Sequence, residues 1–131
     1  MSTNQKNNSL RVAEIKAFVP AKDYEVSKNF YRTLGFEECS DFGDVAYFRH
    51  ESCSFLLQDF YKQELAENFM MHLLVDDARA WFEHVTHLDL TGFAGVKVSE
   101  LKEQPWGMLD FCLWDPSGVL WRIAQNLPKP S

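Results

Sequence analysis

The sequence predicts an α+β fold made of two tandem βαβββ units, in which curved mixed sheets surround a cavity and the helices lie outside. Two observations support this fold class. A strand, a helix and three more strands fit the pattern of about residues 12–60, and the same order recurs over about 68–126. Each helix also carries one apolar stripe. Each unit therefore has a sheet face for its helix to cover, which leaves the other face for the cavity.

Length and composition indicate one domain. The chain has 131 residues, of which 46% are hydrophobic, which suits a single core. We expect residues 11–127 to form it, between a flexible tail at 1–10 and a short tail at 128–131. A net charge of −6 argues against nucleic acid and favours cationic or neutral partners. Charges interrupt every apolar run, which argues against a membrane span, and three scattered cysteines without a CxxC pair favour the cytoplasm.

The first unit begins with a predicted strand over residues 13–19, where apolar residues alternate until Pro20 ends the strand. Asp23 is placed to cap the first helix, and Gly35 supplies the residue after its C-terminal end. Val26, Phe30 and Leu34 form its apolar stripe. Hairpin-length connections then separate three predicted strands, at 36–41, 45–50 and 54–59.

The second unit repeats this order. A strand over residues 69–75 precedes Asp76 and Asp77, which open a helix with Trp81, Val85 and Leu88 on one stripe. Further strands are predicted at 96–103, 108–114 and 119–125. The last two form an antiparallel hairpin, because Asp115 can bond turn amides and Gly118 accepts a positive φ.

Five short motifs occur in the order and spacing of one known superfamily. They are FVPAKD at 18–23, Phe30-Tyr31, Leu34-Gly35-Phe36, Val75-Asp76-Asp77 and Asp115-Pro-Ser-Gly118, the last followed by Arg122 and Asn126. On these motifs, residues 12–127 resemble the glyoxalase/bleomycin-resistance/extradiol-dioxygenase (vicinal oxygen chelate) superfamily. Trp106-Gly107 and the Arg-x-x-Gln-Asn segment at 122–126 are most similar to its bleomycin-resistance branch.

The resemblance implies four metal-ligand positions, two in each unit, which hold a divalent ion in the catalytic members. Counted from the helix openers and from Asp115, they fall at Lys16, Met70, about Gln58 and Arg122. Lysine and arginine would repel a metal, and a guanidinium has no acceptor. We therefore expect no metal and no cofactor. A slip of one pleat that brings His72 into the ligand set would instead favour a metal-dependent lyase, isomerase or extradiol dioxygenase.

Ligand contacts are expected from aromatic and polar side chains on the strands and from one loop ring. Trp106 follows Pro105 in a loop and matches the drug-stacking tryptophan of the resistance branch. His72 is either a ligand contact or a core residue, and Asp110 either bridges Arg122 or faces a cationic ligand. Lys16 and Arg122 either neutralise an anionic substrate group or balance nearby acids. The predicted ligand-binding residues are Lys16, Tyr47, Phe48, Gln58, His72, Trp106, Asp110 and Arg122.

The sequence thus predicts a metal-independent binding protein of the bleomycin-resistance type. It would be a homodimer with a cavity between the chains, sequestering an aromatic or cationic compound such as a bleomycin-family antibiotic. No catalytic residue is predicted, because the chain has no nucleophile-base signature and no glycine-rich phosphate loop. We expect the largest cavity to have an apolar, aromatic lining without convergent histidines or carboxylates.

Overall fold

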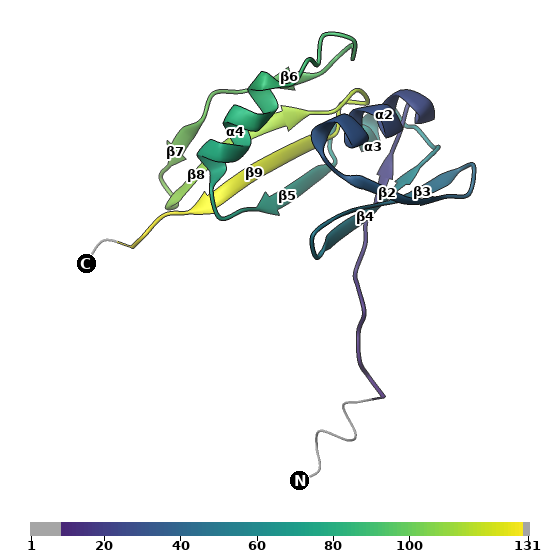
Figure 1. Ribbon diagram of the computed structural model, residues 1–131, viewed down its shortest axis with the longest axis horizontal. Coiled ribbons are helices and arrows are strands. Elements are labelled where there is room, and N and C mark those ends of the chain that lie inside the picture. Colours follow the sequence, from purple (N-terminus) through teal and green to yellow (C-terminus); the bar gives the residue numbers. More distant parts are fainter. Residues whose placement is uncertain (1–8, 130–131) are drawn as a thin grey trace.

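The computed structural model describes residues 9–129, so most of the predicted N-terminal tail lies outside the described residues. Two mixed sheets lie side by side, one for each predicted unit (Figure 1). Their strand orders are β1-β4-β3-β2 and β5-β9-β8-β6, with β7 also paired to β8. The sheets do not close into one barrel. The predicted α+β fold with two units is confirmed. Within residues 9–129, no helix is long and apolar enough to cross a membrane.

The first sheet is built as the turn residues predict, except at its start. Helix α2 (Tyr24–Leu34) is capped by Asp23, whose Oδ1 accepts a hydrogen bond from Val26 N at 3.2 Å, and Gly35 ends it with a φ of 120°. Strand β1 is parallel to β4, and β3 is antiparallel to both β4 and β2. The strands are β1 (Phe18–Pro20), β2 (Glu37–Asp41), β3 (Val45–His50) and β4 (Cys53–Gln58).

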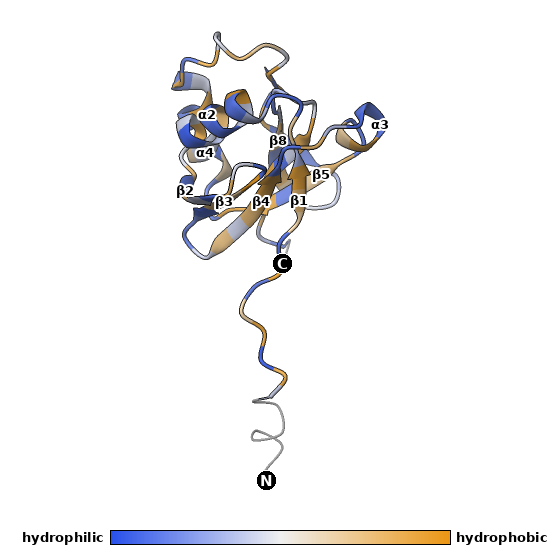
Figure 2. Cartoon of the chain, turned by 90° about the vertical axis from the view of Figure 1, so that its right-hand side faces the viewer, coloured by the Kyte–Doolittle hydropathy of each residue, from blue (hydrophilic) through white to orange (hydrophobic). Residues whose placement is uncertain are grey.

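The predicted strand at 13–19 is wrong in its first five residues. Strand β1 begins only at Phe18, and residues 9–17 form an extended arm that projects away from the sheet (Figure 2). The side chain of Ile15 on this arm is 94% exposed. The alternation is present, but within residues 9–129 residues 13–16 form no strand pairing, and their contact with the first sheet is through side chains such as Glu14.

The second sheet differs from the prediction at one edge. The strand predicted at 96–103 is two short strands that both pair with β8. Ser99 lies between them, and its Oγ accepts the Cys112 amide at 2.8 Å where a backbone carbonyl would continue the ladder. The elements are α3 (Gln63–Ala66), β5 (Met70–Leu74), α4 (Ala78–His87), β6 (Lys97–Val98), β7 (Lys102–Gln104), β8 (Met108–Trp114) and β9 (Leu120–Asn126).

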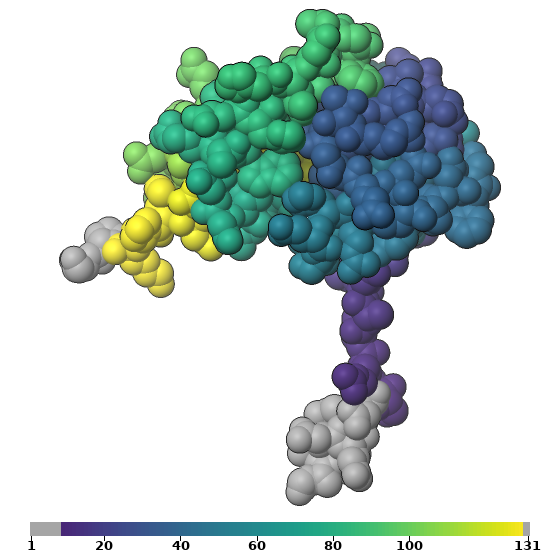
Figure 3. Space-filling view, viewed as in Figure 1, coloured from purple at the N-terminus to yellow at the C-terminus, as the bar shows by residue number. Residues whose placement is uncertain are grey.

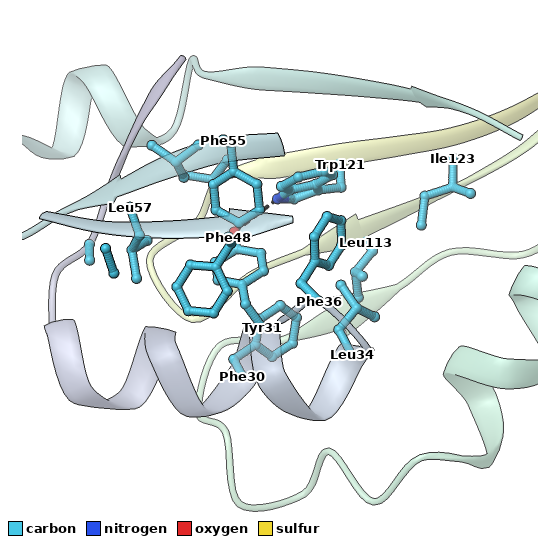
Figure 4. Close-up of a cluster of buried hydrophobic side chains, with 14 of the residues drawn as sticks. Phe30, Tyr31, Leu34, Phe36, Phe48, Phe55, Leu57, Leu113, Trp121 and Ile123 are labelled. Atoms are coloured by element: carbon cyan, nitrogen blue, oxygen red, sulfur yellow. Dashed lines mark hydrogen bonds between the residues drawn. The ribbon is translucent and has the colours of Figure 1, made fainter. Parts of the chain in front are cut away.

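An aromatic core joins the two units (Figure 4). The ring of Tyr31 on α2 lies 4.9 Å from that of Phe55 on β4 and 5.7 Å from that of Trp121 on β9, measured between centroids. Phe48 and Phe55 stack at 5.6 Å. All four rings are buried. Burial of this aromatic surface therefore holds the two repeats together.

The turn between β8 and β9 is tied to the helix of the first unit. Tyr31 Oη donates to Asp115 Oδ2 at 2.5 Å and accepts from Trp121 Nε1 at 2.9 Å. Asp115 Oδ1 accepts the amide of Ser117 at 2.8 Å, as the turn motif predicts, and Ser117 Oγ accepts the Lys22 amide at 2.8 Å. Asp115 is fully buried. The hairpin turn is therefore also an anchor between the units.

Candidate functional site

Within residues 9–129, no helix covers one face of the second sheet (Figure 1). Helix α4 packs on the opposite face, where the Phe82 and Phe111 rings lie 5.3 Å apart, and Figure 3 shows the helical side of the molecule. Directly paired residues on neighbouring strands point to the same side of a sheet. His72, Arg122 and Cys112 are paired in this way across β5, β9 and β8. We call the side that carries these three residues the open face.

Arg122 lies at the centre of the open face. Its Nε is 3.5 Å from Asp110 Oδ2, so the predicted bridge to Asp110 forms as an ion pair. Neither of these buried atoms makes a hydrogen bond within residues 9–129. The Arg122 Nη2 donates to Cys112 Sγ at 3.5 Å, and Gln104 Nε2 donates to Asp110 Oδ1 at 2.9 Å. The contact with Cys112 raises the pKa of Arg122, so the guanidinium stays charged.

The side chain of Trp106 lies beside this ion pair, and more than half of its surface is exposed to solvent. It lies in the turn between β7 and β8, which Gly107 closes with a φ of 86° and a hydrogen bond to Gln104 O at 3.0 Å. The guanidinium carbon of Arg122 is 5.7 Å from the ring centroid, a cation–π distance, and Trp106 is 57% exposed. The turn therefore presents an indole ring that a planar ligand can reach.

Two other predicted residues come together on the first sheet. Tyr47 Oη donates to Glu14 at 2.9 Å, and Lys16 Nζ lies 3.8 Å from Glu14 and 4.9 Å from the Tyr47 centroid. A hydrogen bond from Ser54, more than the one from Tyr47, lowers the pKa of Glu14. Lys16 thus balances a nearby acid. Lys16 on the arm contacts Tyr47 of the first sheet, whereas Arg122 lies on the second sheet, so one chain presents two groups of predicted residues.

Phe48 and Gln58 lie on β3 and β4 of the first sheet. Phe48 has no exposed surface, so its prediction as a ligand contact is wrong for this chain: its side chain points into the core on the alternate side of β3 from Tyr47. Gln58 is half-buried and pairs with Val45 and Pro20 at the end of β4.

Sequence reasoning missed Lys97 and Trp114. Lys97 Nζ lies 4.9 Å from the Trp114 ring centroid, and the two residues are paired between β6 and β8. Trp114 could have been found, because Asp110, Cys112 and Trp114 alternate along one strand and share a face. Lys97 could not have been found in this way, because the face on which it lies depends on where the predicted strand at 96–103 is interrupted, at Ser99.

Three partly open pockets lie away from the open face, and the one with the greatest volume among them lacks the expected aromatic lining. A cavity of about 590 Å³ between α2 and the 92–95 loop includes Lys22, Val26 and Pro116 in its lining. Two adjoining clefts of about 300 and 310 Å³ share His50 and Trp81, and Asp76 and Asp77 lie in one of them. None of these three pockets is lined by a predicted ligand residue.

Most of the folded region matches one family model. The model described as Glyoxalase/Bleomycin resistance protein/Dioxygenase superfamily covers residues 11–123. The chain belongs to this superfamily. No curated protein matches it significantly in sequence.

Solved structures of the superfamily share the fold at low identity. A bleomycin-binding protein complexed with bleomycin has a TM-score of 0.74 and 21% identity, covering 88% of this chain and 99% of its own. A bleomycin-binding protein from bleomycin-producing Streptomyces verticillus, complexed with copper(II)-bleomycin, has a TM-score of 0.70 and 23% identity, and the match covers 91% of this chain and 100% of its own. Lactoylglutathione lyase from Agrobacterium tumefaciens has a TM-score of 0.63 and 16% identity, and the match covers 88% of this chain and 94% of its own.

The superfamily's metal site is not matched by the donors present. The strand register places His72 directly opposite Arg122, with Met70 two residues away on the same face of β5. Of these two residues, His72 offers a lone pair to a metal, whereas the guanidinium of Arg122 has none. Residues 9–129 contain no group of three His, Cys, Asp or Glu side chains able to hold a metal. This donor set does not fit a divalent ion.

Proposed function

We propose that this chain is a metal-independent binding protein of the bleomycin-resistance type, which sequesters an aromatic compound without chemical change. The observation that carries the proposal is the exposed ring of Trp106 beside the Arg122 guanidinium on the open face. A planar ligand can stack on the free indole face, and such contacts add to the burial of apolar area. The bleomycin-binding neighbours make bleomycin the first compound to test.

Replacing Trp106 with alanine is expected to weaken bleomycin binding by about ten-fold or more, because the stacking surface is lost. Isothermal titration calorimetry measures the affinity directly. Trp106→Phe keeps a planar ring and retains most of the affinity, and Phe42→Ala removes another exposed ring, 83% exposed on the β2–β3 turn, without effect. If bleomycin and a panel of planar aromatic compounds fail to bind at millimolar concentration, sequestration is wrong.

The competing function is a metal-dependent lyase, isomerase or dioxygenase, for which His72 opposite Arg122 is a candidate metal donor. Elemental analysis of the purified protein separates the two functions. One tightly bound nickel, zinc, manganese or iron ion per site, with loss of thermal stability on chelation, contradicts the binding proposal. A metal-free protein whose melting temperature ignores chelator supports it.

We propose further that two copies of the chain enclose the ligand, since the open face of one chain leaves a stacked compound exposed to water. The arm supports a homodimer, because Leu10, Val12 and Ile15 are 76%, 81% and 94% exposed on an extended segment. Monomeric proteins rarely leave such an apolar strip uncovered.

Changing Ile15 to aspartate is expected to raise the dimer dissociation constant by at least ten-fold, because a charge would be buried against the partner. Light scattering after gel filtration, across a dilution series, measures this change. Leu65→Asp alters a residue that is 42% exposed on α3 and serves as the control. A wild-type protein that is strictly monomeric at high concentration contradicts the enclosed-ligand model.

A further inference from the structure

The arm is attached to the first sheet through the carboxylate of Glu14. Among residues 9–129, the backbone pairing of this segment with β4 reaches back to Ala17, whose carbonyl accepts the Leu56 amide at 3.0 Å. Glu14 precedes this point, and Tyr47 Oη donates to its Oε1 and Oε2 at 2.9 and 3.1 Å, while Ser54 Oγ donates to Oε2. Two hydroxyl groups from two strands, β3 and β4, therefore hold one carboxylate of the arm.

The charged groups around this carboxylate favour the same contact. Lys16 Nζ lies 3.8 Å from Glu14 Oε2 and 4.9 Å from the Tyr47 ring centroid. Arg49 Nη1 donates to Tyr47 Oη at 3.5 Å, and Arg49 Nε donates to the Glu51 carbonyl at 2.9 Å. The hydrogen bond with Glu14 raises the pKa of Tyr47, so the hydroxyl keeps the proton that it donates. Hydrogen bonds to a charged group are about twice as strong as neutral ones, so these groups suit a carboxylate.

The same contact sets the direction of an apolar side chain on the arm. Successive side chains of an extended segment point to opposite sides. Glu14 and Lys16 both contact Tyr47, so Ile15 between them points away from the first sheet, and it is 94% exposed. An unattached segment would present this side chain in many orientations. The attached arm presents it in one.

We propose that Glu14 is an anchor that positions the arm for a second copy of this chain, and that Tyr47 and Ser54 are the groups that hold the anchor. Anchoring removes part of the conformational entropy that the arm would otherwise lose on association, which strengthens binding. The effect on association rests on the proposed homodimer, whereas the anchor is a property of one chain. Lys16 and Tyr47, both expected as ligand contacts, thereby take part in assembly.

Trypsin cleavage after Lys16 tests the anchor in the full chain, at a dilution at which the wild-type protein is monomeric. The double variant Tyr47→Phe/Ser54→Ala removes both hydroxyl donors without changing the sequence of the arm. We expect it to be cleaved after Lys16 about ten-fold faster than wild type, because the segment opens more often. Tyr61→Phe is the matched control, since it removes the same hydroxyl from a half-buried ring between β4 and α3, and its cleavage rate stays that of wild type. An unchanged rate in the double variant overturns the anchor.

Light scattering after gel filtration, across a dilution series, tests the effect on association. The double variant is expected to raise the dimer Kd by about ten-fold, although its arm keeps every apolar side chain. Glu14→Gln keeps one oxygen acceptor without the charge, so its Kd is expected to lie between those of wild type and Glu14→Ala. Faster cleavage with an unchanged Kd overturns the role in association and leaves the anchor. Faster cleavage in a protein whose wild type is strictly monomeric supports the anchor and removes the homodimer.

Discussion

Replacing Phe55 with alanine is expected to lower the free energy of unfolding by about 3–5 kcal/mol. Phe55 is 1% exposed, and its ring contacts those of Tyr31, Phe36 and Trp121 at centroid distances of 4.9, 5.3 and 5.3 Å. These rings come from both units, so the cavity left by alanine would open at the junction that joins them. Chemical denaturation monitored by circular dichroism measures the loss.

The matched control is Phe42→Ala. Phe42 is 83% exposed at the β2–β3 turn, so removing the same atoms there is expected to change stability by no more than about 0.5 kcal/mol. If the two variants lose similar stability, the aromatic cluster is not the centre of the fold, and the account of how the units are joined is wrong.

Replacing Asp115 with alanine is expected to cost about 3 kcal/mol or more at pH 7, because buried donors lose their acceptor. The Tyr31 hydroxyl and the amides of Ser117 and Val119 all donate to this carboxylate. Asp89→Ala is the control, since Asp89 accepts two hydrogen bonds from Thr91 in an exposed loop, where water replaces the lost acceptor. Equal effects in the two variants would contradict the anchoring role of Asp115.

The same carboxyl gives stability a particular dependence on pH. Burial raises the pKa of Asp115 from 3.8 to about 6, so the folded state holds its proton more tightly than the unfolded state. The stabilisation is complete below about pH 4 and is lost as the pH rises to about 6, by roughly 2–3 kcal/mol. The measurement is the free energy of unfolding of wild type and of Asp115→Asn between about pH 4 and pH 7. The difference between the two proteins gives the contribution of Asp115 and cancels that of Asp41, whose pKa is lowered to about 2 by the hydrogen bond from Lys28.

Much of the fold could be predicted because its signals are local. The Asp23 cap, the glycine at 35 and the Asp115 turn each fix backbone geometry through their own side chains or φ preference, and the repeated order supplied the topology. Two strands could not be placed this way. Alternation at 13–16 says nothing of a partner strand, and the break at Ser99 depends on a hydrogen bond to Cys112, which is distant in sequence.

The site was harder to predict than the fold, because it depends on register between strands. The bridge between Asp110 and Arg122, one of the two alternatives for Asp110, does form, since one short hairpin fixes the relation of the two residues. The count of positions along the sequence placed Met70, and not His72, in the same set as Arg122. That His72 lies opposite Arg122 follows only from the parallel pairing of β5 with β9. Lys97 reaches Trp114 across a third strand, beyond the range of any local pattern.

The bond between Tyr31 and Asp115 has a consequence for how the chain is made. It joins residues 84 positions apart, and Trp121 completes the same cluster from β9. During synthesis the first unit therefore emerges without the groups that satisfy its central tyrosine, and it cannot mature until the final hairpin has left the ribosome. Contacts of such long sequence separation slow folding. The aromatic side chains of the nascent first half thus lack their partners from the second unit until the final hairpin is made, and such exposed apolar surface favours aggregation.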